Sequence, residues 1–331
     1  MKKYVRILTA TLFFILGSMI LNAAPKKLQV GFTTAMNPDD PYFVFGTEFA
    51  RIVKEKTKGG IEVDLLGAGQ LGQEREMFEG MQLGTVDMAI MTNAYASNFV
   101  AASGLFDLPF IFAGNKVAAD ILDGPIGQAV LAEYTKEGVI ALAWGEGGFR
   151  HLVTMKTPVR KPADFAGLKI RCMETKTYIA TYNAVGANAV PMAWSETITG
   201  LQQGTIDGLD IPISVIYSNG FPDIAKYLNL TGHFYSPLVM CISAEIWGGF
   251  SKEEQAILKD AAVEAGKADR AHNARVEGEL LKKMKDAGMN IIDDVDIPAF
   301  QAQLKNFYGE QKGAIGGTYV DDLLKVLAET K

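Results

Sequence analysis

Two arginines occupy positions where a guanidinium group can bind a carboxylate. Arg171 is near the end of an apolar segment, Leu168 to Cys172, that is typical of a strand, and a helix is expected from about Thr177 to Val185. The planar guanidinium matches both oxygens of a carboxylate, and the amides at a helix N-terminus add positive potential. The alternative at this position is a structural ion pair with an acid such as Glu174.

The second arginine, Arg150, lies in a glycine-rich passage from Trp144 to His151. This passage leaves one apolar strand, Val139 to Ala143, and enters another. Glycine lets a backbone approach a ligand closely, and it also lets the chain cross between domains. Arg150 is therefore either a ligand contact or a solvated side chain of an interdomain connection.

Other candidates for this site are polar and aromatic side chains. Thr92 and Asn93 follow a predicted strand, and Asp210 has the related place in a second segment. Short polar groups at the carboxyl ends of strands can contact hydroxyl or amine groups of a ligand, or they can cap the next turn. Trp194 and Tyr235 can form apolar walls, although large aromatic side chains are more often part of a core.

An internal repeat indicates two lobes of similar construction. Seven residues between Glu76 and Asp87 recur between Glu196 and Asp207 at a constant offset of 120 positions, six of them identical. In each copy a helix ends at a glycine, which is expected to supply a left-handed cap before the next strand. Open α/β sheets bind ligands beyond the carboxyl ends of their strands, so two facing lobes would enclose a cleft.

Alternating short apolar strands and helices favour parallel α/β units. The first are strands at Leu28 to Thr33 and Ile61 to Leu66, with helices at Tyr42 to Thr57 and Gly72 to Leu83. Ser251 and Glu254 form a capping box for a helix that extends to about Asp286. Because this helix is long for one lobe, we expect it to lie across both, with Gly266 and Gly278 as candidate bending points.

The N-terminus has the pattern of a secretory signal peptide. A basic start precedes the uncharged apolar run Ile7 to Leu21, and Ala23 and Ala24 are candidate cleavage sites. The run of about 15 residues is shorter than the roughly 20 that cross a bilayer, which disfavours a membrane anchor. No cysteine follows it to carry a lipid. We therefore expect residues 1–24 to be a signal peptide and the mature protein to be free in solution.

Charge and length restrict the remaining possibilities. Without the three basic residues of the leader, 29 basic residues face 38 acidic ones, a net charge of −9, which repels nucleic acid and anionic lipid. A mature chain of roughly 305 residues is expected to form two domains. Cys172 and Cys241 either pair in an oxidising compartment or remain two buried thiols, and neither has the spacing of a metal or redox site.

Catalytic and cofactor motifs are largely missing. Gly67 to Gly72 fits the dinucleotide pattern GxGxxG, but Asp87 opens the next strand where an acid should close it, so a surface turn is expected instead. The three histidines lack metal-ligand spacing, and neither a nucleophile elbow nor a phosphate loop occurs. We expect no metal and no cofactor. A hydrolase that uses cleft acids such as Asp210 and Glu174 is the enzymatic alternative.

Several longer motifs occur in order along the chain. They are DLPF at 107–110, GFRH at 148–151, GLKIR at 167–171, PMAWSE at 191–196, LQQGTIDG at 201–208 and YLNLTGH at 227–233. Together they resemble the solute-binding receptors of tripartite ATP-independent periplasmic (TRAP) transporters, of the dicarboxylate-receptor type. The resemblance implies an α/β, two-lobed periplasmic-binding-protein fold with hinge strands, a long helix bridging both lobes, and closure on the ligand.

The resemblance also implies roles for particular residues. Arg171 would pair with the substrate carboxylate with help from Arg150, Trp194 would form a pocket wall, and the segment around Thr92 would contribute to specificity. The chain departs from its relatives at Leu209-Asp210-Ile211-Pro212, where they commonly have Gln-Glu-Asn-Pro. Ile211 replaces an asparagine that often supports the carboxylate, so the pocket is less polar there or the ligand sits differently.

These observations predict a monomeric periplasmic receptor for a small organic acid, with hydroxy or sugar acids ahead of dicarboxylates. Its partners would be the membrane subunits of a TRAP transporter, or alternatively a sensor kinase. Lobe I is expected at residues 25–147 and 237–276, and lobe II at 148–236 and 277–331. The expected ligand-binding residues are Arg171, Arg150, Asp210, Trp194, Asn93, Thr92, Glu174, Ile211 and Tyr235.

Overall fold

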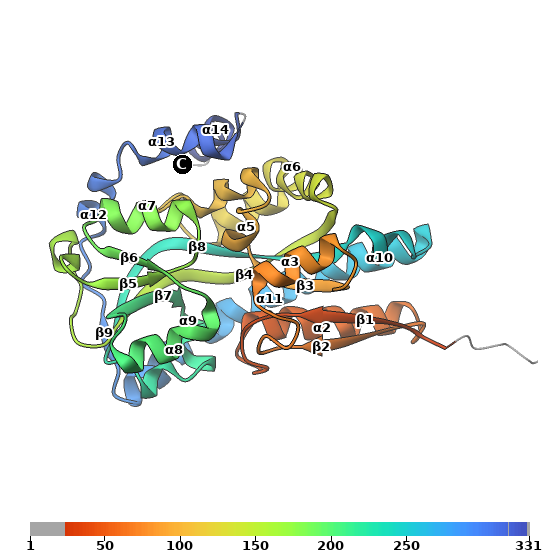
Figure 1. Cartoon of the computed structure of the whole chain (residues 1–331), viewed down its shortest axis with the longest axis horizontal. Coiled ribbons are helices and arrows are strands. Elements are labelled where there is room, and N and C mark those ends of the chain that lie inside the picture. The colour runs from red at the N-terminus through yellow and green to blue at the C-terminus, as the bar shows by residue number, and fades with distance from the viewer. Residues whose placement is uncertain (1–23, 317, 330–331) are drawn as a thin grey trace, which may run out of the picture.

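The computed structural model describes residues 24–316 and 318–329, so the expected signal peptide lies almost entirely outside the described residues. One mixed sheet has the strand order β2-β1-β3-β8-β4-β7-β5-β6, and β9 pairs with β8 (Figure 1). The strands are β1 (Lys26–Gly31), β2 (Ile61–Leu66), β3 (Met88–Thr92), β4 (Val139–Thr154), β5 (Lys169–Cys172), β6 (Asn188–Pro191), β7 (Gly208–Pro212), β8 (Tyr227–Ser243) and β9 (Asn290–Ile292).

Helices surround this sheet. They are α2 (Pro41–Lys56), α3 (Glu74–Gln82), α4 (Asn93–Ala96), α5 (Asn115–Asp123), α6 (Pro125–Glu133), α7 (Lys176–Ala184), α8 (Trp194–Gln203), α9 (Ile213–Ser218), α10 (Ala244–Gly248), α11 (Lys252–Asp286), α12 (Ile297–Gln303), α13 (Phe307–Ile315) and α14 (Tyr319–Glu329). Short 3-10 helices are η1 (Ala101–Asp107), η2 (Tyr134–Glu137), η3 (Pro162–Phe165) and η4 (Phe221–Asp223). The first four elements predicted from sequence all form, with ends that shift by at most two residues.

The long strands β4 and β8 join two halves of the molecule (Figure 1). They pair antiparallel along their length, and β8 also pairs with β3 while β4 also pairs with β7. We call the two sides the β1–β3 half and the β5–β7 half. The sequence predicts two strands separated by a glycine-rich passage, and this is wrong. Residues 139–154 form one strand. Pairing of β4 with β8 continues through the glycine-rich passage, because the register shifts there, for example between Glu146 and Gly148.

The repeated segment builds the same helix-to-strand connection in each half. Gly84 and Gly204 both have φ +70°, as expected for left-handed glycines after α3 and α8. The carboxylate of Asp87 accepts a backbone N–H of β1 at 2.9 Å, and that of Asp207 accepts one of β5 at 2.8 Å. Each repeat therefore fixes a parallel strand pair, β1 with β3 and β5 with β7, which brings their carboxyl ends together.

Helix α11 bridges the two halves, as the sequence predicts. Ser251 caps it by accepting the Glu254 N–H at 3.2 Å, and Glu254 in turn accepts the Ser251 N–H at 2.7 Å. The helix packs against α2 in the β1–β3 half and against α9 in the β5–β7 half. Gly266, a candidate bending point, allows close packing instead, because a Cβ there would lie 2.3 Å from the carbonyl oxygen of Trp144.

The expected lobe boundaries fall inside continuous elements. One division, at 147/148, lies within β4, the next, at 236/237, within β8, and the last, at 276/277, within α11. These boundaries stay predictions. Helices α13 and α14 contact η1, and α14 also contacts α6, so the C-terminal segment expected in lobe II also packs on the β1–β3 half.

The other features singled out in the sequence have structural roles. Gly67 to Gly72 forms a turn in which Gly69 and Gly72 have φ +71° and +100°. Cys172 and Cys241 are free, buried thiols. Across residues 24–316 and 318–329, no helix is long and apolar enough to span a bilayer, and no group of three or more acidic, histidine or cysteine side chains is arranged to hold a metal.

Candidate ligand-binding site

A small cavity with a volume of about 30 Å³ lies where the two halves meet. The β1–β3 half contributes Thr33, Thr34, Tyr42, Glu74, Thr92 and Tyr95. Strand β4 and the β5–β7 half contribute Arg150, Arg171, Met173, Trp194, Ile211, Pro212 and Val215. The structure thus brings together five of the nine residues expected from sequence: Arg171, Arg150, Thr92, Trp194 and Ile211.

Arg171 provides an unmatched positive charge in this cavity. The side chain is only 1% exposed, and its Nε and Nη2 donate to the Met192 carbonyl at 3.0 and 2.8 Å. Its guanidinium carbon lies 5.9 Å from the ring centre of Trp194. Among the described residues no carboxylate lies within 4.0 Å of it, so the alternative ion pair with Glu174 is not formed. A buried cation without an acidic partner is costly unless an anion joins it.

The other arginine is neutralised within the protein. Nε of Arg150 donates to the Asp210 carboxylate at 3.1 Å, and Nη2 donates to the Asp210 carbonyl. Both side chains are buried, and His233 adds its Nε2 at 3.5 Å from the same carboxylate. Burial would raise the pKa of Asp210, but the Arg150 charge, the contact with His233 and the Arg150 hydrogen bond together outweigh burial and hold that pKa well below the ordinary value. Asp210 therefore does not line the cavity itself, but it neutralises Arg150, which does.

Glu74 adds an acid to the opposite wall. The side chain lies in the first turn of α3, is 4% exposed, and accepts the backbone N–H of Thr92. Burial raises the pKa of Glu74 to about 7, although the Thr92 N–H and the charges of Arg171 and Arg150 favour the ionised form. Next to it, the Tyr42 hydroxyl forms a hydrogen bond with that of Thr92. This wall offers several polar groups to a hydroxylated ligand.

Three expected site residues point elsewhere. Asn93 begins α4 and donates to the Ser103 carbonyl at 2.9 Å and to Asp107 at 2.8 Å, inside the β1–β3 half. Tyr235 donates to Glu146 at 2.6 Å, and Glu174 accepts a bond from Tyr95 at 3.4 Å. None of these three side chains lines the described cavity, so any ligand contact by them stays a prediction.

The chain matches the family model of the bacterial extracellular solute-binding proteins, family 7, over residues 32–313. The chain belongs to this family. It is 34% identical over 283 residues to the 2,3-diketo-L-gulonate-binding periplasmic protein of Escherichia coli, covering 86% of each chain. That relative and the C4-dicarboxylate-binding protein of Rhodobacter capsulatus are both named as periplasmic. The expected periplasmic location is thus confirmed at the level of the family, whereas the signal peptide stays a prediction.

Solved structures of TRAP periplasmic solute-binding proteins share the fold. One from a Polaromonas species, bound to D-erythronate, has a TM-score of 0.86 and 35% identity over 90% of this chain and 98% of its own. The sugar acid binding protein of Advenella mimigardefordensis, in complex with galactonate, has a TM-score of 0.88 and 26% identity, covering 93% and 99%. The expected two-lobed α/β fold is confirmed. The chain is a binding protein for transport and not an enzyme.

Several lining residues of this solute-binding protein were not predicted. Thr33 and Thr34 follow β1, so the carboxyl-end rule that identified Thr92 and Arg171 could also have found them. Tyr42 and Glu74 lie in the first turns of helices that begin after long loops. Their approach to the cavity depends on tertiary packing, for which no local sequence signal was available.

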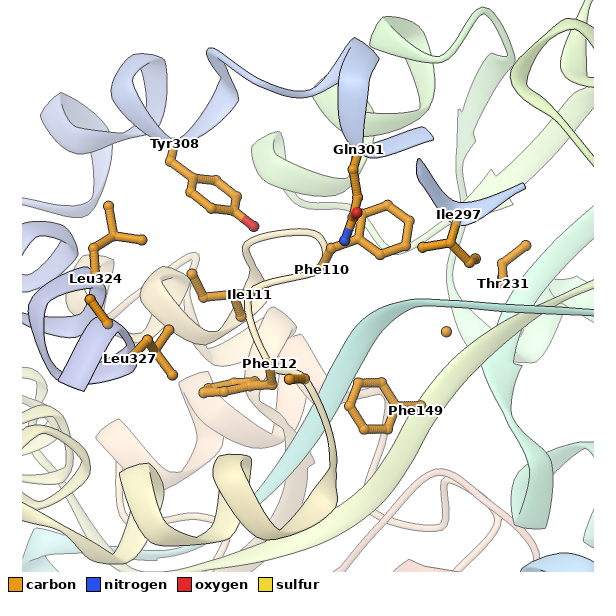
Figure 2. A pocket seen from close by; sticks show the side chains of 13 residues that line it. Phe110, Ile111, Phe112, Phe149, Thr231, Ile297, Gln301, Tyr308, Leu324 and Leu327 are labelled. Atoms are coloured by element: carbon orange, nitrogen blue, oxygen red, sulfur yellow. The ribbon is translucent and has the colours of Figure 1, made fainter. Parts of the chain in front are cut away.

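A larger apolar cavity lies between the C-terminal helices and the central strands (Figure 2). It has a volume of about 620 Å³ and is lined mainly by apolar side chains such as Phe112, Phe149 and Leu327. The Tyr308 hydroxyl at its edge already donates to the Pro109 carbonyl, and the Thr231 hydroxyl is bonded to His233. Because none of the described residues that line it is charged, this cavity does not suit a carboxylate.

Buried acids should make this solute-binding protein more stable at mildly acidic pH. Burial raises the pKa of Glu74 and Asp107 to about 7 and that of Asp40 to about 6. A raised folded-state pKa gives stability that is present at low pH and lost as pH rises through that value. Thermal unfolding should therefore show a Tm that rises by roughly 2 °C or more between pH 8 and pH 6.5.

The predicted rise of Tm at lower pH can be tested with a variant, and a buried histidine limits its size. Asp107→Asn removes one of these groups and should flatten the rise. The rise is opposed by His151 from about pH 7 downward, because burial lowers the pKa of His151 in the folded state to about 3 whereas the unfolded chain binds this proton near pH 6.5. A Tm that stays constant or falls from pH 8 to pH 6.5 would contradict the assignment.

Proposed function

We propose that this protein captures a small hydroxy or sugar acid in the periplasm and delivers it, as a monomeric receptor, to the membrane subunits of a TRAP transporter. The carboxylate of the ligand pairs with Arg171. One observation carries this proposal: Arg171 is buried at the cavity and has no acidic partner among the described residues. A ligand carboxylate would supply the missing charge in a bidentate geometry.

The charged residues that line the cavity favour a ligand with one carboxylate over a ligand with two. Arg150 is matched by Asp210, so Arg171 is the only arginine of the described cavity lining that lacks an acidic partner. A second carboxylate would approach Glu74, which repels it when ionised. Hydroxyl groups, in contrast, can donate to Glu74 and bond with Thr34 and Tyr42, and a hydrogen-bonded site rejects analogues that leave its polar groups unpaired.

A matched series of four-carbon compounds tests this proposal. D-Erythronate has one carboxylate and three hydroxyls, succinate has two carboxylates, and erythritol has hydroxyls alone. Because ligand binding stabilises the folded state, D-erythronate at about 100 times its Kd should add about 2.7 kcal/mol and raise Tm by roughly 5 °C or more. Succinate should give a much smaller shift at equal concentration, and erythritol none.

The series also separates the alternatives. A shift with succinate alone would replace the hydroxy acid by a dicarboxylate. A shift with erythritol equal to that with D-erythronate would show that the carboxylate contributes nothing, and the role proposed for Arg171 would then be wrong. Calorimetric titration of the best ligand gives the stoichiometry, which should be one per chain.

A further inference from the structure

One buried carboxylate joins the two halves beside the cavity. Asp40 is fully buried at the N-cap of α2 and accepts four hydrogen bonds. Its Oδ1 accepts from the Thr34 hydroxyl at 2.7 Å and from the Tyr42 N–H at 3.0 Å, both within its own half. Its Oδ2 accepts from Ser218 Oγ at 2.9 Å and Asn219 Nδ2 at 3.2 Å, at the end of α9 in the other half. Oδ1 therefore bonds within the β1–β3 half, and Oδ2 bonds to the β5–β7 half.

Both sides of this contact lead directly to the cavity wall. Thr34 and Tyr42 line the cavity on one side, and Val215 lines it on the other. The Val215 carbonyl accepts from Asn219 Nδ2 at 3.1 Å. A ligand that touches these walls therefore also holds the groups that bond to Asp40, although Asp40 itself does not line the cavity.

We propose that Asp40, Ser218 and Asn219 form a latch that holds the two halves closed over the ligand and sets the rate at which the ligand leaves. The inference rests on the proposed function, because a latch matters only if a solute is enclosed. Opening the cleft would separate α2 from α9 and break two charge-assisted hydrogen bonds, which are stronger than neutral ones. The latch therefore stabilises the closed state, and its loss lowers affinity by shifting that equilibrium.

Two substitutions remove the latch from opposite sides. Asp40→Asn keeps the N-cap, because asparagine caps helices as well as aspartate does, but it turns an NH2 group toward the two donors of α9. Ser218→Ala removes a donor without touching α2. The dissociation rate of D-erythronate should rise about tenfold in Asp40→Asn and less in Ser218→Ala, with little change in the association rate. Since both changes break the same contact, the double variant should be less than additive.

The measurement is stopped-flow tryptophan fluorescence, because Trp194 lines the cavity. At pH 8 the Asp40 carboxyl is ionised, since its pKa is about 6. Ser97→Ala is the matched control: its hydroxyl donates to the Ala94 carbonyl within the β1–β3 half, and its loss should leave the dissociation rate unchanged. Wild-type dissociation rates in both latch variants would overturn the latch.

A second readout does not depend on the ligand. Spin labels at Thr47→Cys on α2 and Asp223→Cys on η4 report the distance across the cleft, and Cys172 and Cys241 are buried away from the label. Asp40→Asn should shift the distribution toward longer distances in ligand-free protein. If D-erythronate fails to bind wild-type protein, the proposed ligand is wrong, but the distance distribution still decides the latch. Identical distributions in the variant and the wild type would exclude it.

Discussion

Arg171→Ala is expected to weaken binding of the carboxylate ligand by at least about 100-fold. Truncating one partner of a buried charge pair costs about 2 to 5 kcal/mol, and each 1.4 kcal/mol is a factor of about ten in Kd. Arg171 is the arginine of the described cavity lining without an acid within 4.0 Å, so no other guanidinium can replace it without giving up its own partner. Isothermal titration calorimetry on the purified mature protein measures the loss.

Two further variants make this result specific. Arg171→Lys keeps the charge but loses the planar pair of donors, so its binding should also be poor. Arg160→Ala removes a half-exposed arginine whose partner is Asp294, and it should bind like the wild type. The ligand-free variants must unfold at a Tm near that of the wild type. Normal affinity in Arg171→Ala would end the proposal that this side chain holds the ligand.

The sequence was informative where a local rule determines the structure. The 120-residue repeat predicted two glycine-ended helices that lead into strands, and both form with left-handed glycines at 84 and 204. The capping box at Ser251 predicted the start of α11, because a cap is satisfied by residues three positions apart. Arg171 and Thr92 were found because the carboxyl ends of parallel strands meet at one edge of a sheet.

The features of the site that the sequence did not predict depend on the direction in which each side chain faces. Asn93 follows Thr92 directly, yet it turns into the core to bond with Asp107, because α4 begins there. Tyr235 lies on β8 opposite Phe149, where the register shifts of β4 decide the face of each residue. Glu74 belongs to the cavity only because α3 packs at the end of β3. Position along a strand predicts nearness to the site, whereas orientation requires the packed structure.

Asp210→Ala is expected to lower the free energy of unfolding by about 3 to 5 kcal/mol. The variant leaves Arg150 buried and 4% exposed without its carboxylate, and it also removes the acid beside His233. Desolvating an unpaired guanidinium is costly, so the folded state loses stability while the unfolded state is hardly affected. Urea unfolding at pH 7 measures the difference, with the slope of the transition as a check on two-state behaviour.

The matched control is an ion pair of the same residue types at the surface. Asp294→Ala leaves Arg160 exposed to water, and such pairs contribute only about 0 to 1 kcal/mol, so its stability should change little. The double variant Arg150→Met, Asp210→Leu removes both charges together and should recover most of the lost stability, since apolar residues of similar size can replace a buried pair. If Asp210→Ala is no less stable than Asp294→Ala, the pair does not hold Arg150 at the cavity. If the double variant is as unstable as the single one, the loss came from packing and not from the unpaired charge.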